Sequence, residues 1–145
     1  MSPAGIFVTG TDTGVGKTLV ACALLEMLNA DGISTGAFKP VAAGARQTPE
    51  GWRNEDAELL MARSSVSLDY AQVNPVTLPQ PVAPHIAAAR VGVELEIPAL
   101  VGAFDALARR ARFVVTEGAG GWLVSFMNVL PLVLGAAVGG VTAER

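Results

Sequence analysis

The sequence predicts an α/β fold in which a parallel sheet is flanked by helices, and three observations support that prediction. Short apolar runs typical of buried strands alternate with segments of helical periodicity, in the order 6–8, 17–30, 35–41, 98–112 and 113–116. A glycine-rich loop joins the first strand to the first helix. The chain has 145 residues, 51% of them hydrophobic, which is ample for the core of one domain spanning 1–145.

Two helices are expected in the first half of the chain. The helix at 17–30 is followed by Gly32, since glycine adopts the left-handed conformation that often closes a helix. A shorter helix is expected at 54–62, with the side chain of Asn54 as its N-terminal cap.

The strand at 35–41 carries a lysine near its end. Lys39 is expected to be extended, because the residue before a proline, here Pro40, disfavours helical geometry. The polar, glycine-bearing segment 42–53 that follows is expected to be a loop.

The second half begins with a proline-punctuated stretch, 68–84, that is expected to be irregular. A helix could begin at His85, directly after a proline. The helix at 98–112 is amphipathic, and its apolar face carries Leu100, Val101, Phe104, Leu107 and Ala108. The strand at 113–116 then leads to Glu117 and a run of small residues.

The loop after the first strand reads Gly10-Thr-Asp-Thr-Gly-Val-Gly-Lys-Thr18. Its glycines let successive backbone N–H groups point into one concavity, and the positive end of the following helix attracts an anion. Lys17 can reach the β- and γ-phosphates of a nucleotide, and the Thr18 hydroxyl can ligate Mg²⁺. The loop is one residue longer than the usual pattern. It predicts a nucleoside triphosphate site in preference to a glycine-rich turn that merely precedes a helix.

Charged side chains at the predicted strand ends are candidates for the same site, because ligands of such sheets bind beyond the carboxyl ends of the strands. Glu117 is expected to bind Mg²⁺ directly or through water, although it could instead cap the turn at Gly118. Lys39 is either a functional cation at an open sheet edge or a solvated lysine. Asp56 is either a second acid of the site or a residue favoured by the dipole of its helix.

Composition narrows the function classes. The net charge of -3 gives no electrostatic case for nucleic acid as a partner. The single cysteine, Cys22, is expected to be a buried core thiol. No cluster of cysteine and histidine suggests zinc, and the one histidine, His85, is expected to be structural or to line a pocket.

The location expected from the sequence is the cytoplasm, since the N-terminus shows no signal peptide. The stretch 118–143 is uncharged, and within it 122–141 is long and apolar enough to be a membrane span. The competing interpretation, which we favour, is that 130–135 is a strand buried on both faces of the sheet.

These motifs together resemble the dethiobiotin synthetase family, ATP-dependent enzymes of biotin synthesis. The matching stretches follow the family's order and cover the chain from about Phe7 to Trp122. They are Val8–Thr18, Lys39-Pro-Val-Ala42 with Gly44, Thr48–Gly51, Arg53-Asn-Glu-Asp56, Val73-Asn-Pro75, Pro84-His-Ile86 and Glu117–Trp122. The longer phosphate loop is the family's own form. The resemblance implies a P-loop NTPase-like parallel sheet flanked by helices.

The resemblance also implies a reaction and a set of site residues. CO2 adds to one amine of 7,8-diaminononanoate, ATP phosphorylates the resulting carbamate, and the second amine closes a ureido ring with release of phosphate. Lys17 and Lys39 would be catalytic, and Thr18, Asp56 and Glu117 would hold Mg²⁺. ATP would contact Thr13, Gly14, Val15, Gly16, Lys17, Thr18, Leu19, Asp56, Glu117, Gly118, Ala119 and Gly120, and substrate would contact Thr13, Lys39 and Ala43. Family members are homodimers.

Two departures from the family pattern leave alternatives open. Ala43 replaces a serine or threonine that hydrogen-bonds the substrate in many members, and such a neutral bond contributes about 0.5–1.5 kcal/mol. After Trp122 the pattern fades, and the resemblance leads us to expect that the family's later segments, which hold the nucleotide base, are missing. The domain is therefore expected to be incomplete after about residue 122, and a catalytically impaired nucleotide-binding remnant is the alternative. A partitioning-type switch ATPase is disfavoured because Asp12 stands where its signature lysine would be.

Overall fold

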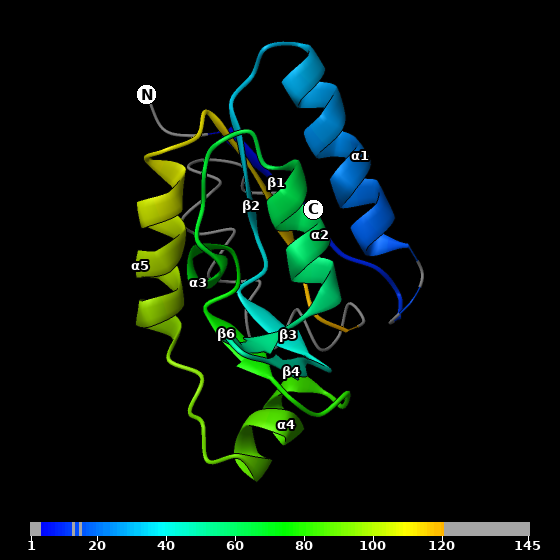
Figure 1. Cartoon of the computed structure of the whole chain (residues 1–145), viewed down its shortest axis with the longest axis vertical. Coiled ribbons are helices and arrows are strands. Elements are labelled where there is room, and N and C mark those ends of the chain that lie inside the picture. Colours follow the sequence, from blue (N-terminus) through cyan, green and yellow to red (C-terminus); the bar gives the residue numbers. More distant parts are fainter. Residues whose placement is uncertain (1–3, 13, 15, 121–145) are drawn as a thin grey trace, which may run out of the picture.

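A three-stranded parallel sheet forms the centre of the chain (Figure 1), which we describe from a computed structural model for residues 4–12, 14 and 16–120. The strands are β1 (Ala4–Val8), β7 (Phe113–Glu117) and β2 (Thr35–Phe38), in the spatial order β1-β7-β2. This arrangement confirms the expected α/β fold. Because all three strands run the same way, their carboxyl ends meet at one edge of the sheet.

Helices cover both faces of this sheet (Figure 1). Helices α1 (Lys17–Ala30) and α2 (Glu55–Arg63) lie on one face, and α5 (Ile97–Ala108) lies on the other. Each face has its own apolar core. The α1 and α2 side is built on Val8, Ala21, Cys22, Leu25, Ala37, Leu60, Val73 and Val115, and the α5 side includes Phe38, Leu100, Phe104, Leu107, Ala108 and Val114.

Alternation along the strands divides the apolar side chains between the two cores. In β7, Val114 packs on the α5 side and Val115 on the α1 side, and in β2 Ala37 and Phe38 alternate in the same way. The Phe38 ring meets Phe104 of α5 edge to face, with ring centroids 5.6 Å apart. A strand buried on both faces in this manner reads as a continuous apolar run, which is why it could be recognised in the sequence.

The expected helix boundaries hold to within about one residue, except at the end of α5. Helix α1 ends where expected, and Gly32 follows with φ of 72°. Asn54 caps α2, since its side-chain oxygen accepts a hydrogen bond from the backbone N–H of Ala57. Helix α5 stops at Ala108, short of the expected 98–112, because the chain must turn into β7, where the backbone N–H groups of residues 112 and 113 bond to Ser34.

Two expectations for the segment after β2 are wrong. The strand expected at 35–41 breaks at Lys39 and Pro40, because proline has no N–H to donate to a sheet ladder. The expected loop 42–53 contains strand residues: β3 (Val41–Ala43) pairs with a later strand, and β4 (Arg46–Thr48) forms an antiparallel hairpin with β5 (Gly51–Arg53). In this hairpin Thr48 is paired with Gly51, which adopts φ of 111°.

The stretch expected to be irregular also contains short elements. These are α3 (Tyr70–Val73) and β6 (Val76–Leu78), the latter paired in parallel with β3. Helix α4 (Pro84–Arg90) follows and starts at the proline itself, one residue before the expected start. His85 is exposed on this helix, which argues against a structural role, and it does not line the cavity described below.

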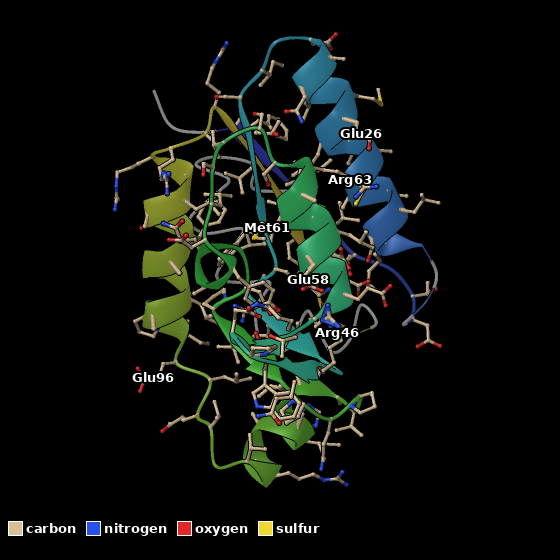
Figure 2. The ribbon with its side chains drawn as sticks, viewed as in Figure 1. Glu26, Arg46, Glu58, Met61, Arg63 and Glu96 are labelled. Atoms are coloured by element: carbon tan, nitrogen blue, oxygen red, sulfur yellow. The ribbon has the colours of Figure 1, made fainter. Side chains whose placement is uncertain are left out.

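Surface ion pairs connect the helices and the hairpin (Figure 2). Arg63 of α2 bonds to Glu26 of α1 at 3.0 Å, and Arg46 of β4 bonds to both oxygens of Glu58 of α2. Pairs as exposed as these contribute about 0–1 kcal/mol each, so packing and not surface charge holds α2 in place.

No helix within the described part of the chain combines the length and apolar character needed to cross a membrane. The membrane-span interpretation of 122–141 and the strand expected at 130–135 both fall outside the residues described, as does the incomplete region expected after residue 122.

Cys22 is buried in the core between α1 and the sheet, as expected. Burial raises the pKa of its thiol above the ordinary value, so the reactive thiolate is disfavoured. We expect a colourimetric disulfide reagent at pH 7.5 to modify the native chain at least about 100 times more slowly than the urea-unfolded chain. Equal rates in the two states would contradict this placement of the cysteine.

Candidate functional site

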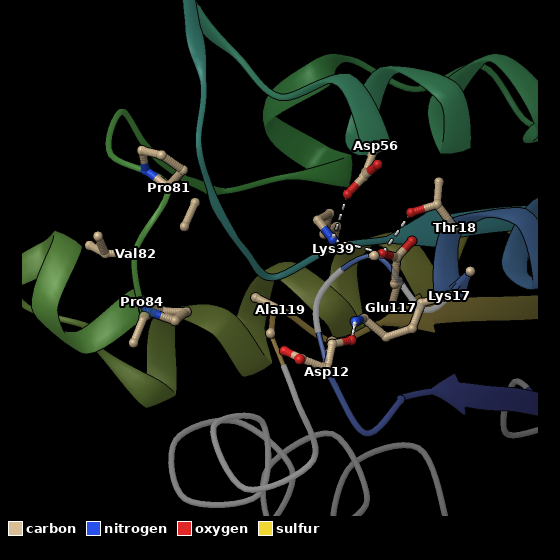
Figure 3. A pocket seen from close by; sticks show the side chains of 16 residues that line it. Asp12, Lys17, Thr18, Lys39, Asp56, Pro81, Val82, Pro84, Glu117 and Ala119 are labelled. Carbon is tan, nitrogen blue, oxygen red and sulfur yellow. Dashed lines mark hydrogen bonds and ion pairs between the residues drawn. The ribbon is translucent and has the colours of Figure 1, made fainter.

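A cavity of about 620 Å³ lies at the carboxyl edge of the sheet (Figure 3). One wall carries the charged and hydroxyl side chains of Lys17, Thr18, Lys39, Asp56 and Glu117. The opposite wall is formed by the stretch from Pro81 to Pro84, at the start of α4. The cavity therefore joins a charged region to a largely apolar one.

Glu117 is the centre of the charged wall. It ends the central strand β7 and is 1% exposed. Its Oε1 atom accepts hydrogen bonds from the Thr18 hydroxyl and from the Lys39 ammonium, both at 2.9 Å. Its Oε2 atom is buried and has no hydrogen-bond partner among the described residues. A buried carboxylate oxygen without a partner is costly, so this atom is suited to a donor or cation that a ligand brings.

Lys39 lies directly after β2 and reaches across the sheet edge to Glu117. Its Nζ atom is 2.9 Å from Glu117 Oε1 and 3.7 Å from Asp56 Oδ2. The residue is only 4% exposed, so the interpretation of a solvated lysine at an open edge is wrong. Asp56, by contrast, keeps 46% of its side chain exposed, on the first turn of α2. A cation between two carboxylates, one of them buried, faces the cavity.

The phosphate loop approaches the same edge from β1. Gly14 and Gly16 adopt φ of 77° and 100°, a conformation that L side chains rarely tolerate. No side chain in the described part of the chain caps α1, and its first turn has no acidic residue, so the helix N-terminus can receive an anion. The Lys17 ammonium folds back onto the backbone oxygen of Asp12, at 2.8 Å.

The structure brings most of the expected site residues together. Those that line the cavity are Gly14, Gly16, Lys17, Thr18, Lys39, Ala43, Asp56, Glu117, Gly118, Ala119 and Gly120. Leu19 does not line it, and the residue is 76% exposed on α1. Thr13 and Val15 lie outside the described residues.

Sequence reasoning did not name two parts of the lining. Asp12 lines the cavity, and its place inside the loop motif is the signal that could have identified it. The wall at 81–83 belongs to the stretch expected to be irregular, and only the neighbouring Pro84 stood out. Prolines indicate that such a stretch is not helical, but they do not indicate which way it faces.

The oxygen donors of the charged wall fit Mg²⁺. Thr18, with its hydroxyl, Asp56, with a half-exposed carboxylate, and Glu117, whose buried Oε2 has no hydrogen-bond partner among the described residues, all line the cavity together with the phosphate loop. Mg²⁺ prefers hard oxygen ligands and is commonly held by one or two carboxylates together with phosphate oxygens and water. The donor set therefore suits this ion in the presence of a nucleotide.

Comparison with known proteins agrees with this geometry. The family model described as an AAA domain matches residues 4–130. The chain is 51% identical to the ATP-dependent dethiobiotin synthetase BioD of Xanthomonas oryzae pv. oryzae (strain PXO99A) over 122 residues, 84% of this chain and 54% of that protein. It is also 51% identical to BioD 1 of Escherichia coli (strain K12) over 116 residues, 80% of this chain and 52% of that protein. The resemblance seen in the sequence is confirmed, and the chain spans about half the length of the curated relatives it matches.

Proposed function

The chain belongs to the AAA domain family, and from this membership and its charged cavity we propose that it carries out ATP-dependent closure of a ureido ring, forming dethiobiotin. The substrates would be 7,8-diaminononanoate, CO2 and ATP. The observation that carries the proposal is the hydrogen-bonded group of Thr18 with the buried Lys39 and Glu117 beside a phosphate loop, in a relative of enzymes named for this reaction.

The phosphates of ATP would occupy the loop end of the cavity. Backbone N–H groups at the start of α1 and the Lys17 ammonium would donate to phosphate oxygens, with Lys17 exchanging its present bond to the Asp12 backbone for a charged partner. Thr18, Asp56 and Glu117 would hold Mg²⁺, which supplies charge neutralisation at the transferring phosphoryl group. Thr13 and Ala43 would lie toward the diamine.

The proposed reaction brings two anions together, the carbamate and the γ-phosphate of ATP. An amine of the substrate attacks CO2 and loses a proton, a carbamate oxygen attacks the γ-phosphorus, and ADP leaves. The second amine then attacks the carbamate carbon, loses a proton and expels phosphate. Lys39 would stabilise both the carbamate and the transferring phosphoryl group, because its ammonium is buried and lines the cavity, and charge interactions strengthen where water is excluded.

A second candidate function is nucleotide binding without turnover. It is favoured by the phosphate loop itself, because Gly14 and Gly16 in left-handed conformation and the uncapped start of α1 could receive phosphates without the rest of the cavity. Both candidates use the phosphate loop, but only the first needs Lys39 and the opposite wall of the cavity to act on a second substrate.

One assay separates the two candidates. The chain is incubated with ATP, Mg²⁺, bicarbonate and 7,8-diaminononanoate, and mass spectrometry measures dethiobiotin while a coupled assay measures phosphate. We expect product and phosphate in equal amounts, dependent on the diamine, and a loss of about 100-fold or more in Lys39→Met. ATP binding by calorimetry with no product from the folded chain would reject turnover and leave the second candidate.

The homodimer stays a prediction. Analytical ultracentrifugation of the same sample tests it by the sedimentation of the chain.

A further inference from the structure

The backbone of Lys39 is held by a segment outside the main sheet. The pairing of β2 with β7 ends at Phe38, so Lys39 has no partner in that ladder. Its N–H instead donates to the backbone oxygen of Val73 at 2.8 Å, and its carbonyl oxygen accepts from Asn74 Nδ2 at 2.7 Å. Both backbone groups of the proposed catalytic lysine therefore bond to the carboxyl end of α3.

Asn74 is buried, 2% exposed, and its amide makes four hydrogen bonds. Nδ2 donates to Lys39 and to the backbone oxygen of Val76 at 2.9 Å. Oδ1 accepts from the hydroxyls of Tyr70 at 2.8 Å and Thr77 at 2.7 Å. An asparagine side chain offers two donors and two acceptor positions, so its hydrogen-bonding capacity is filled and its orientation is fixed.

The Tyr70 hydroxyl extends this network to the acidic side of the cavity. It donates to Asn74 and accepts a hydrogen bond from the backbone N–H of Asn54 at 2.7 Å. Asn54 caps α2, and Asp56 lies on the first turn of that helix. The guanidinium of Arg53 covers the Tyr70 ring, 4.3 Å from its centroid. One continuous chain of hydrogen bonds thus runs from the backbone of Lys39 to the start of α2.

We propose that Asn74 is a positioning residue, which sets the Lys39 ammonium against Glu117 and, through Tyr70, against Asp56. The proposal rests on the proposed function in one respect: the position of Lys39 matters for catalysis only if Lys39 acts in the proposed reaction. Lys39 is next to a proline and beyond the last paired residue of β2, so the sheet alone does not fix it. Displacements of about 1 Å can reduce catalysis roughly 100-fold, which is why such a lysine needs a second anchor.

The composition of the chain provides a readout that does not depend on turnover. Lys17 and Lys39 are its only two lysines, and both line the cavity. Amine acylation followed by peptide mass spectrometry therefore gives a rate for each, with Lys17 as the internal reference. Asn74→Asp keeps the size of the side chain but replaces the donor to the Lys39 carbonyl with an oxygen. Tyr70→Phe is milder, because it keeps the ring beneath Arg53 and removes only the hydroxyl.

We expect Asn74→Asp to raise the acylation rate of Lys39 about tenfold and Tyr70→Phe about threefold, while the rate of Lys17 changes less than about twofold. The matched control is Thr35→Val, at the other end of β2 from Lys39. Thr35 is buried, and the substitution removes its part-buried hydrogen bond to Asn29 of α1. It should destabilise the chain without changing the ratio of the two lysine rates.

The proposal is overturned if both lysines accelerate together in the two variants, which is the result of general loosening, or if folded Tyr70→Phe leaves the Lys39 rate unchanged. If Asn74→Asp does not fold, the Tyr70→Phe result alone decides. A selective change at Lys39 in a chain that makes no dethiobiotin would support the positioning role and reject the proposed reaction. Where turnover is present, kcat should fall in both variants with the KM for ATP nearly constant, since neither residue lines the nucleotide site.

Discussion

Lys17→Met is expected to weaken the binding of ATP by about 100-fold and to leave the folded chain nearly as stable as before. The loss follows from removal of one ammonium that would make charge-assisted hydrogen bonds to phosphate oxygens, each contributing about 1.5–3 kcal/mol. The effect on stability is small because the hydrogen bond of Lys17 goes to a loop carbonyl, that of Asp12, and methionine keeps the apolar stem of the side chain.

Isothermal titration with ATP and Mg²⁺ measures the affinity, and urea unfolding measures the stability. Arg46→Met is the matched control, since it removes the same charge and a similar length of side chain from a hairpin outside the cavity. We expect the control to bind ATP within about twofold of the unaltered chain. Equal binding by Lys17→Met and the control would refute the assignment of the loop as the phosphate site.

The part of the site that follows from local rules could be predicted from the sequence. The loop residues from Gly14 to Thr18 are adjacent in the chain, and the helix they start is part of the motif. Glu117 could be placed as well, because the carboxyl ends of parallel strands must meet at one edge. For these residues, spacing and strand direction are enough, and no side-chain packing has to be known.

The environment of Lys39 could not be predicted in the same way. Its burial depends on Glu117, which lies 78 residues later in the sequence, and on hydrogen bonds from the end of α3. The hairpin in 46–53 was missed because its strands are polar, short and outside the main sheet, so neither apolar runs nor alternation mark them. The only local signs were Pro49 in the turn and Gly51, with its positive φ, directly after the turn.

The second large effect is expected on the free energy of unfolding, when the ion pair between Lys39 and Glu117 is broken. Both side chains are almost completely buried, at 5% and 1% exposure, and their charged atoms are 2.9 Å apart. Removal of one partner leaves the other as a buried charge with little compensation, which costs about 3–5 kcal/mol. Lys39→Met leaves Glu117 with the Thr18 hydroxyl, and Glu117→Gln leaves Lys39 with Asp56 at 3.7 Å.

The double variant should be much more stable than the sum of the two losses predicts. Replacement of a buried ion pair by well-packed neutral groups is often close to neutral, so Lys39→Met with Glu117→Gln is expected to lose less than about 2 kcal/mol in total. The coupling free energy between the two residues would then be several kcal/mol, whereas residues without contact are additive within about 0.5 kcal/mol. Urea unfolding of the four proteins, read by circular dichroism, gives this value.

The exposed pair of Arg46 and Glu58 provides the comparison within the same chain (Figure 2). Its donor and acceptor are 2.8 Å apart, as close as the buried pair, but Arg46 is 60% exposed. A double-mutant cycle on Arg46 and Glu58 is expected to give a coupling free energy below about 1 kcal/mol, because water screens both charges. Similar couplings for the two pairs would show that the cavity edge is wet enough to solvate Lys39. The low-dielectric environment on which its proposed role in phosphoryl transfer depends would then be absent.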